Sequence, residues 1–228
     1  MEQIQQKHRE QQNEKLPLVL ASASPRRREL ISLLGLPYIT CVSPVEEEML
    51  EARYIGPADG LAQWLAEQKA LATHTLPGFD GHIVVTADTT VILDDKILGK
   101  PRDEEEAREI LVALRGRRHY VVTGVAASKV ENDILKVQSE RVVTPVTMRN
   151  YSEKEIAAYV ASGEPMDKAG AYGIQNLSFH PVERIDGCYL NVVGLPLCAL
   201  VDVLAEFNVY PVLHPHESPC PWSPRCKV

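Results

Sequence analysis

The chain has 228 residues, enough for one large domain or two closely joined lobes around a substantial core. Its 31 acidic and 24 basic residues give a formal net charge of −7, which argues against a general binder of nucleic acid or anionic membranes, because such proteins normally present a basic face. The five cysteines, an odd number, favour reduced thiols in the cytoplasm over a disulfide framework.

The two ends of the chain differ in composition from its centre, which leaves residues 16–210 as one expected domain. Residues 1–15 are rich in Gln, Glu and Lys and lack the apolar centre of a signal peptide, so we expect a disordered extension. No apolar run approaches the roughly 20 residues of a membrane span, and we expect no membrane partner. In the proline-rich tail 211–228, an unstructured segment is favoured over a zinc site. The zinc alternative would use His214, His216, Cys220 and Cys226.

The first elements form a strand, a serine-rich turn and a helix. Residues 18–20 predict a short buried strand, Ser24 suits a helix N-cap, and Pro25 suits the first helical position. We expect the helix to end near Gly35. A strand end that meets a helix N-terminus presents free N–H groups to a phosphate, and Arg26 and Arg27 add positive charge there. The pattern alone leaves open an ordinary helix start with solvated arginines.

The middle of the chain continues to alternate strands and helices. Residues 38–42 predict a strand, the run Glu46 to Glu48 a solvated loop, and residues 57–73 a helix with an apolar side. A second buried strand over 83–86 is expected to end in Ala87-Asp88-Thr89. Further expected elements are a hairpin turning at Asp94-Asp95, with strands at 91–93 and 97–98, and a helix from Asp103 to Gly116 whose capping box uses Glu106.

Strands dominate the last part of the chain. Residues 119–129 and 134–148 predict two long strands, and Ser152 with Glu155 predicts a capping box for a helix reaching Gly163. The expected elements after it are an ordered loop over 163–175, strands at 178–185 and 189–193, and a final helix over 196–207. This order predicts an α/β fold with a mixed, partly antiparallel sheet and flanking helices.

Several charged residues are candidates for a functional site. Asp88 follows a buried strand, where α/β sheets place ligand-contacting residues, and we favour that role over an Asx-turn. Lys69 lies on the apolar side of its helix, where the pattern alone favours a side chain that snorkels to solvent over one that reaches a polar cleft. Glu47 and Lys100 lie in predicted loops, where solvent exposure is the default.

Together these residues could bind a divalent cation and a polyphosphate. Glu47 and Asp88 could supply carboxylate oxygens to a hard divalent cation such as Mg²⁺, which keeps several positions for water and phosphate. Four cations could neutralise a polyphosphate whose charge would otherwise repel the carboxylates. They are Arg26, Arg27, Lys69 and Lys100.

Several short blocks of sequence stand out in order along the chain. They are Ala-Ser-Ala-Ser-Pro-Arg-Arg at 21–27, Glu46-Glu47, Glu67-Gln68-Lys69-Ala70, Ala87-Asp88-Thr89-Thr90-Val91, Gly99-Lys100-Pro101-Arg102, and the loop 163–175, which ends in Asp-Lys-Ala-Gly-Ala-Tyr-Gly-Ile-Gln. Through these blocks the chain resembles the Maf-like nucleotide pyrophosphatases from residue 18 to residue 207.

The resemblance implies hydrolysis of a nucleoside triphosphate to its monophosphate and pyrophosphate, with Asp88 as the catalytic base. It implies substrate-binding roles for Arg26, Arg27, Lys69 and Lys100, and a divalent metal, Mg²⁺ or Mn²⁺, held by Glu47 and Asp88. The alignment leaves Glu46 and Glu48 open as alternatives to Glu47. It also implies an elongated two-lobed body similar to the inosine triphosphate pyrophosphatases, and a homodimer.

The resemblance also bears on which nucleobase the protein recognises. The group of the family that prefers dTTP and UTP has Arg, Thr and Gln at the positions of Arg26, Thr89 and Gln175, and this chain carries that set. A glutamine amide can both donate to and accept from the edge of uracil or thymine, and an arginine donates to a carbonyl. The expected function is therefore dTTP/UTP pyrophosphatase activity in nucleotide-pool house-cleaning, including modified pyrimidine nucleotides. The alternative is a nucleotide-binding regulator of cell division whose hydrolysis is incidental.

Overall fold

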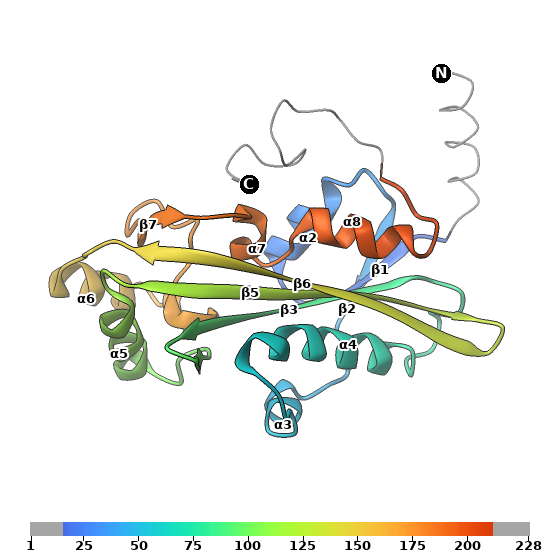
Figure 1. Ribbon diagram of the computed structural model, residues 1–228, viewed down its shortest axis with the longest axis horizontal. Coiled ribbons are helices and arrows are strands. Elements are labelled where there is room, and N and C mark those ends of the chain that lie inside the picture. Colours follow the sequence, from blue (N-terminus) through green and yellow to red (C-terminus); the bar gives the residue numbers. More distant parts are fainter. Residues whose placement is uncertain (1–15, 212–228) are drawn as a thin grey trace, which may run out of the picture.

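A computed structural model describes residues 16–211 as an elongated α/β molecule built on one seven-stranded sheet (Figure 1). The strand order is β2-β1-β3-β5-β6-β7, with β4 paired to β3. β1 pairs in parallel with β2 and β3, and the other pairs are antiparallel, which confirms the predicted mixed sheet. The strands are β1 (Leu18–Ala21), β2 (Tyr38–Cys41), β3 (Val84–Leu93), β4 (Lys96–Leu98), β5 (Arg118–Glu131), β6 (Ile134–Met148) and β7 (Val182–Ile185).

Helices cover both faces of this sheet. In Figure 1, α4 lies below the strands, whereas α2, α7 and α8 lie above them. The α-helices are α2 (Pro25–Ser32), α3 (Glu47–Glu51), α4 (Leu61–Thr73), α5 (Glu104–Leu114), α6 (Glu153–Ala161), α7 (Tyr189–Val193) and α8 (Leu197–Ala205). Short 3₁₀ turns occur at η1 (Ala58–Gly60), η2 (Glu164–Asp167) and η3 (Ala169–Ala171).

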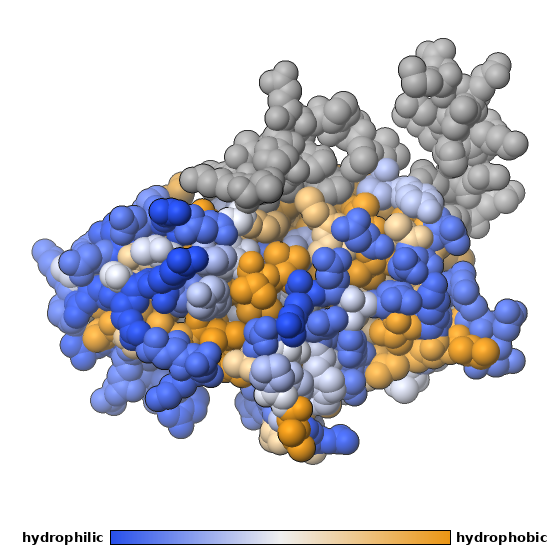
Figure 2. Space-filling view, in the orientation of Figure 1, coloured by the Kyte–Doolittle hydropathy of each residue, from blue (hydrophilic) through white to orange (hydrophobic). Residues whose placement is uncertain are grey.

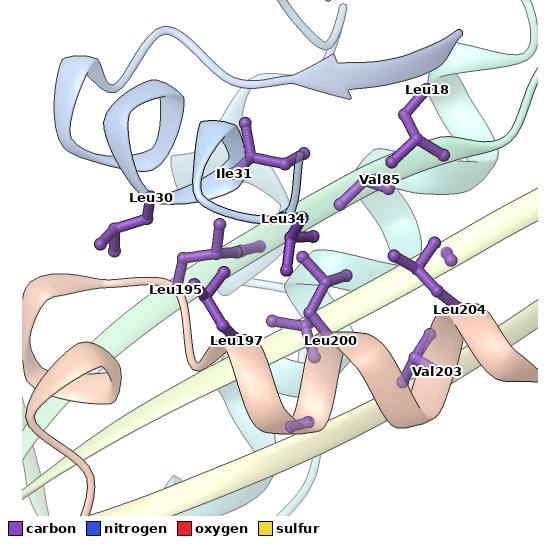
Figure 3. Close-up of a cluster of buried hydrophobic side chains, with 14 of the residues drawn as sticks. Leu18, Leu30, Ile31, Leu34, Val85, Leu195, Leu197, Leu200, Val203 and Leu204 are labelled. Carbon is purple, nitrogen blue, oxygen red and sulfur yellow. The ribbon is translucent and has the colours of Figure 1, made fainter. Parts of the chain in front are cut away.

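Two large hydrophobic clusters lie at different ends of the long strands. In the first, α2 and α8 pack against β1 and β3, with Leu34, Leu195 and Leu200 fully buried (Figure 3). In the second, α5 and α6 pack against β5 and β6 around Leu111 and Met148. Separate cores at the two ends agree with the expected two-lobed body. The likeness to inosine triphosphate pyrophosphatases stays a prediction.

The local signals for turns and caps are largely confirmed. Ser24 caps α2 by accepting a hydrogen bond from the Arg27 N–H, and Pro25 occupies the first turn. Asp94 and Asp95 both have positive φ, as a two-residue hairpin turn between antiparallel strands requires. Ser152 and Glu155 form the predicted capping box of α6. At these three positions the structure follows the short-range signals of the sequence.

Four predictions about elements are wrong. The strand expected at 83–86 runs on to Leu93 as β3, because it pairs with β5 over nine residues. The acidic run expected as a loop begins the helix α3, and the strand expected at 189–193 is the helix α7. The expected capping box of α5 is incomplete, because the Glu106 carboxylate accepts from Arg102 instead of from the N-cap residue Asp103.

Gly124 sets the distance between α4 and the sheet. A Cβ atom at this position would lie 2.3 Å from the Cα atom of Gln63 and 2.5 Å from the carbonyl oxygen of Ala62. The backbone of α4 therefore rests directly on β5 at a residue without a side chain. Gly124 is also the residue paired with Asp88 across β3 and β5, so this close approach lies beside the candidate site.

The surface is mixed in character. Figure 2 shows a largely hydrophilic face with apolar areas between the charged ones, including at α3, where Met49 is exposed. None of the helices in residues 16–211 is long and apolar enough to cross a membrane. The predicted N-terminal extension and the zinc alternative in the tail lie outside the described residues.

Candidate active site

The site lies beside an interruption in the sheet. On the side of β3 that faces β1, pairing with β1 involves Val84 and Val85, and pairing with β4 resumes at Val91. Within the described residues, the stretch 86–90 thus has no strand neighbour on that side. Asp88 and Thr89 are consecutive residues of this stretch, so their side chains lie on opposite faces of the sheet. The gap between β1 and β4 is open to both faces, so both side chains can border it. This corrects the prediction that Asp88 follows the end of a strand.

Lys69 joins two carboxylates at this opening. Its Nζ atom lies 2.5 Å from Oδ1 of Asp88 and 2.6 Å from Oε1 of Glu47. The side chains of Lys69 and Asp88 are only 6% and 12% exposed, whereas that of Glu47 is 43% exposed. The expectation from the pattern alone, that Lys69 snorkels to solvent, is therefore wrong. The Lys69 side chain instead reaches from α4 to Asp88 on β3.

Among Glu46, Glu47 and Glu48, Glu47 is the residue whose carboxylate contacts Lys69 and Lys100. Burial raises its pKa, but attraction to Lys69 and a hydrogen bond from it outweigh that effect, with Lys100 and Arg27 contributing further, so the pKa lies below its usual value. Nζ of Lys100 is 3.6 Å from Oε2 of Glu47, and its side chain is 60% exposed. Lys100 therefore stays accessible at the rim, beside the carboxylate that it faces.

A third carboxylate, Glu51, was missed by the sequence reasoning. It lies one turn after Glu47 on α3, and its pKa is raised by burial and by repulsion from Asp88 and Glu47. The signal was the i, i+4 spacing, which places two residues on one side of a helix. That signal was not usable because residues 46–48 were expected to form a loop.

Arg27 approaches the same opening from α2. Its Nε atom donates to the carbonyl of Gly194, Nη1 to the carbonyl of Ala87, and Nη2 to Oγ1 of Thr89, at 2.9, 2.7 and 3.1 Å. The Ala87 carbonyl belongs to the unpaired side of β3, so the guanidinium replaces a neighbouring strand there. Burial lowers the pKa of Arg27, whereas Asp88 and Glu47 raise it. Arg27 is thus a fixed positive charge close to the carboxylates.

The other predicted residues lie further out. Nη1 of Arg26 is 3.8 Å from Oδ2 of Asp167, so this contact links α2 to the loop containing η2. Gln175 lies exposed in a turn after η3. The same loop is tied to the segment before Lys100, because the Gly170 N–H donates to the Gly99 carbonyl. The structure thus brings Glu47, Lys69, Asp88 and Lys100 into direct contact, with Arg27 and Thr89 adjoining them and Arg26 and Gln175 at the periphery.

Comparison with known proteins identifies the family of this chain. The chain matches the family described as "Maf-like protein" over residues 17–207, and it belongs to that family. Three similar relatives are each named "dTTP/UTP pyrophosphatase". The protein from Dehalococcoides mccartyi is 42% identical over 91% of this chain and 90% of the relative. Those from Geobacter sulfurreducens and Bacillus cereus are 47% and 46% identical, over 86% and 84% of this chain and 98% and 96% of their own lengths.

Proposed function

We propose that this chain hydrolyses dTTP and UTP, together with modified forms of these nucleotides, to the monophosphate and pyrophosphate, and so removes unwanted nucleotides from the cellular pool. The main support for this proposal is the position of the Lys69 ammonium group, which contacts both Glu47 and Asp88 at the unpaired stretch of β3. Arg27 lies beside this stretch. The names of the relatives support the substrate class. A triphosphate needs this combination of fixed cations and carboxylates.

The pair Glu47 and Asp88 fits a divalent cation, Mg²⁺ or Mn²⁺. Their oxygens already converge on one positive charge, and carboxylate oxygen is the preferred ligand of such ions. Within residues 16–211 no group of three or more acidic, histidine or cysteine side chains forms a complete metal cage, so water and phosphate would fill the remaining positions. When bound, the ion supplies charge neutralisation to the phosphates.

Asp88 is the proposed base. Lys69 is bonded to Oδ1, so Oδ2 can take the proton of a water molecule that attacks the α-phosphorus. The new bond joins the water oxygen to the α-phosphorus, and the bond from this phosphorus to the α,β-bridging oxygen breaks. Pyrophosphate leaves with the bonding electrons. Lys69, Lys100 and Arg27 hold the phosphates, and Lys69 and Lys100 also stabilise the charge that develops on the leaving group.

Of the three positions that the resemblance links to the nucleobase, Arg26 and Gln175 are proposed to contact it, whereas the Thr89 hydroxyl is bonded to Arg27 and Thr123. Uracil and thymine present two carbonyl acceptors on either side of an N3–H donor, which an arginine and a glutamine amide can match. Cytosine places an amino donor where arginine would also donate, which leaves polar groups unpaired and weakens binding. Arg26 and Gln175 come from α2 and from the loop after η3, so a bound base would connect the two segments.

We also propose that the protein works as a homodimer in the cytoplasm, where nucleoside triphosphates are made and used. In the described part of the chain, β2 pairs only with β1 and carries exposed Ile39 at the sheet edge. A second copy could cover such an edge. Light scattering and cell fractionation test the two statements separately.

Hydrolysis in ¹⁸O-labelled water tests the reaction. With dTTP or UTP and Mg²⁺ or Mn²⁺, we expect monophosphate and pyrophosphate, with the label in the monophosphate, because attack occurs at the α-phosphorus. Diphosphate with orthophosphate would refute the cleavage site, and label in pyrophosphate would refute the attacked atom. Tight nucleotide binding with negligible turnover would favour the regulator alternative instead.

A further inference from the structure

A chain of hydrogen bonds continues from Arg27 into the interior of the molecule. Nη2 of Arg27 donates to Oγ1 of Thr89, which lies 2.9 Å from Oγ1 of Thr123 on β5. The Thr123 hydroxyl in turn donates to the backbone carbonyl of Asn191 on α7 at 2.8 Å. Thr123 and Asn191 are fully buried, so solvent does not compete for these bonds.

Counting protons fixes the direction of every bond in this chain. A backbone carbonyl can only accept, so the single hydroxyl proton of Thr123 goes to Asn191. The bond between the two threonines therefore uses the proton of Thr89. The Thr89 hydroxyl is then oriented with its oxygen toward Arg27, from which it accepts. A hydroxyl that could rotate freely would not present a lone pair to the guanidinium at all times.

The far end of the chain is rigidly held. The Asn191 side chain accepts from the Thr123 N–H and donates to the carbonyl of Val121 and to Oγ1 of Thr144. These bonds attach α7 to two strands at once. Gly194 caps the same helix with φ +119°, a conformation that favours glycine, and its carbonyl accepts directly from Nε of Arg27. Both Asn191 and Gly194 therefore connect α7 to the arginine.

We propose that Thr123 and Asn191 are positioning residues for nucleotide binding, which act through Thr89 on Arg27. The inference rests on the proposed function, because Arg27 is the member of this chain proposed to touch the phosphates. A guanidinium has five N–H donors, and three are bonded to Gly194, Ala87 and Thr89. One N–H on each terminal nitrogen remains available to a phosphate, and the three bonds hold the guanidinium plane in place for it.

The test removes one hydroxyl and leaves shape and volume nearly unchanged. In Thr123→Val, the Thr89 proton loses its acceptor and the contact to Arg27 loosens. We expect KM for dTTP to rise about tenfold while kcat changes by less than about twofold, because binding in the ground state and the transition state weakens alike. Thr123→Ser keeps the hydroxyl and should restore KM. Should Thr123→Val not fold, Thr123→Ala makes the same deletion with a smaller side chain.

A second readout does not depend on catalysis. In the wild type, the Nε–H of Arg27 should give a slowly exchanging NMR signal, assigned by its loss in Arg27→Lys. We expect faster exchange in Thr123→Val and recovery in Thr123→Ser. Ser128→Ala is the matched control, since Ser128 is equally buried on the same strand but bonds His74, and it should change neither readout.

The outcomes separate the positioning role from the proposed function. Unchanged Nε–H exchange in Thr123→Val would overturn the role, and so would faster exchange with an unchanged KM. A wild-type protein that leaves every triphosphate intact would refute the proposed function. The Nε–H exchange would then still decide whether Thr123 fixes Arg27.

Discussion

At the scale of single residues, Lys69 holds the two carboxylates of the candidate site together. Its ammonium group is the shared partner of a buried and a half-exposed carboxylate, which would otherwise face each other without compensation. Periodicity could place Lys69 on the inner side of α4 but not choose between solvent and cleft. That choice depends on Asp88, which is 19 residues away in the chain and is brought close by the packing of α4 on β3.

Replacing Lys69 by methionine tests this function directly. We expect Lys69→Met to lower the free energy of unfolding by about 3 kcal/mol, because Asp88 is left as a buried charge without a partner. We also expect kcat/KM to fall by at least about 100-fold. Urea denaturation and steady-state kinetics measure the two effects. Lys129→Met is the control, since its pair with Glu131 lies near the surface and should contribute less than about 1 kcal/mol. Equal losses in both variants would contradict the assignment.

The proposed catalytic base, Asp88, leads to a second prediction at the scale of single residues. Asp88→Asn keeps the shape of the side chain but cannot take a proton, so kcat should fall about 1,000-fold while the protein stays folded and binds nucleotide. Circular dichroism, nucleotide titration and turnover check the three parts. Asp94→Asn, at the exposed turn after the same strand, should keep normal turnover. Normal turnover in Asp88→Asn would show that another group is the base.

At the scale of elements, the structure separates what local signals determine from what they do not. The start of α2 was predictable, because Ser24 and Pro25 act on their immediate neighbours. The helix α7 was not, because its run of apolar residues is equally typical of a buried strand. The side chain of Asn191 bonds Val121 on β5 and Thr144 on β6, which are 70 and 47 residues earlier in the chain. Non-local contacts of this kind override local propensity.

The contact of α4 with β5 yields a prediction about Gly124. Gly124→Ala should lower the free energy of unfolding by about 3 kcal/mol, because the added methyl group would overlap the backbone of α4 and force the helix away from the sheet. The same displacement should weaken the contact between Lys69 and Asp88 and reduce turnover. Gly99→Ala is the control for stability, since no atom lies within 4 Å of its added Cβ. A stable, fully active Gly124→Ala would mean that α4 tolerates the shift.

At the scale of the whole molecule, the lobe formed by α5, α6 and the loop after α6 should be sensitive to acid. His119 is fully buried there, its Nε2 atom lies 2.7 Å from the Tyr172 hydroxyl, and Nδ1 has no partner. Burial lowers the pKa of His119 from 6.5 to about 4. The unfolded chain therefore binds a proton between these values that the folded chain does not. The contribution of His119 to the free energy of unfolding is fully present above pH 6.5 and is lost as the pH drops toward 4.

This difference corresponds to a loss of about 3 kcal/mol between pH 6.5 and pH 4. Urea denaturation across this range measures the loss, and an NMR titration of the ring should give a midpoint near 4. In His119→Gln the contribution of this residue to the pH dependence should vanish. A ring midpoint near 6.5 in the wild type would contradict the prediction.

The overall architecture was predictable in class, because the alternation of strands and helices and the two long strands are encoded in local patterns. The convergence of the site was expected from charge chemistry and from the family resemblance. It was not derivable from spacing, since it depends on which residues of β3 pair with β1 and β4. The same register explains why Asp88 lies within a strand.

The interruption between β1 and β4 has one further consequence. An unpaired strand edge normally invites another polypeptide to add to the sheet, and this is a common route to aggregation. Here the free stretch spans only residues 86–90 and is closed at both ends by strands of the same chain, with Arg27 already bonded to Ala87. A free stretch of five residues between two paired ends is too short for a foreign strand to extend the sheet. The unpaired strand edge at the candidate site is thus protected from aggregation with other protein molecules.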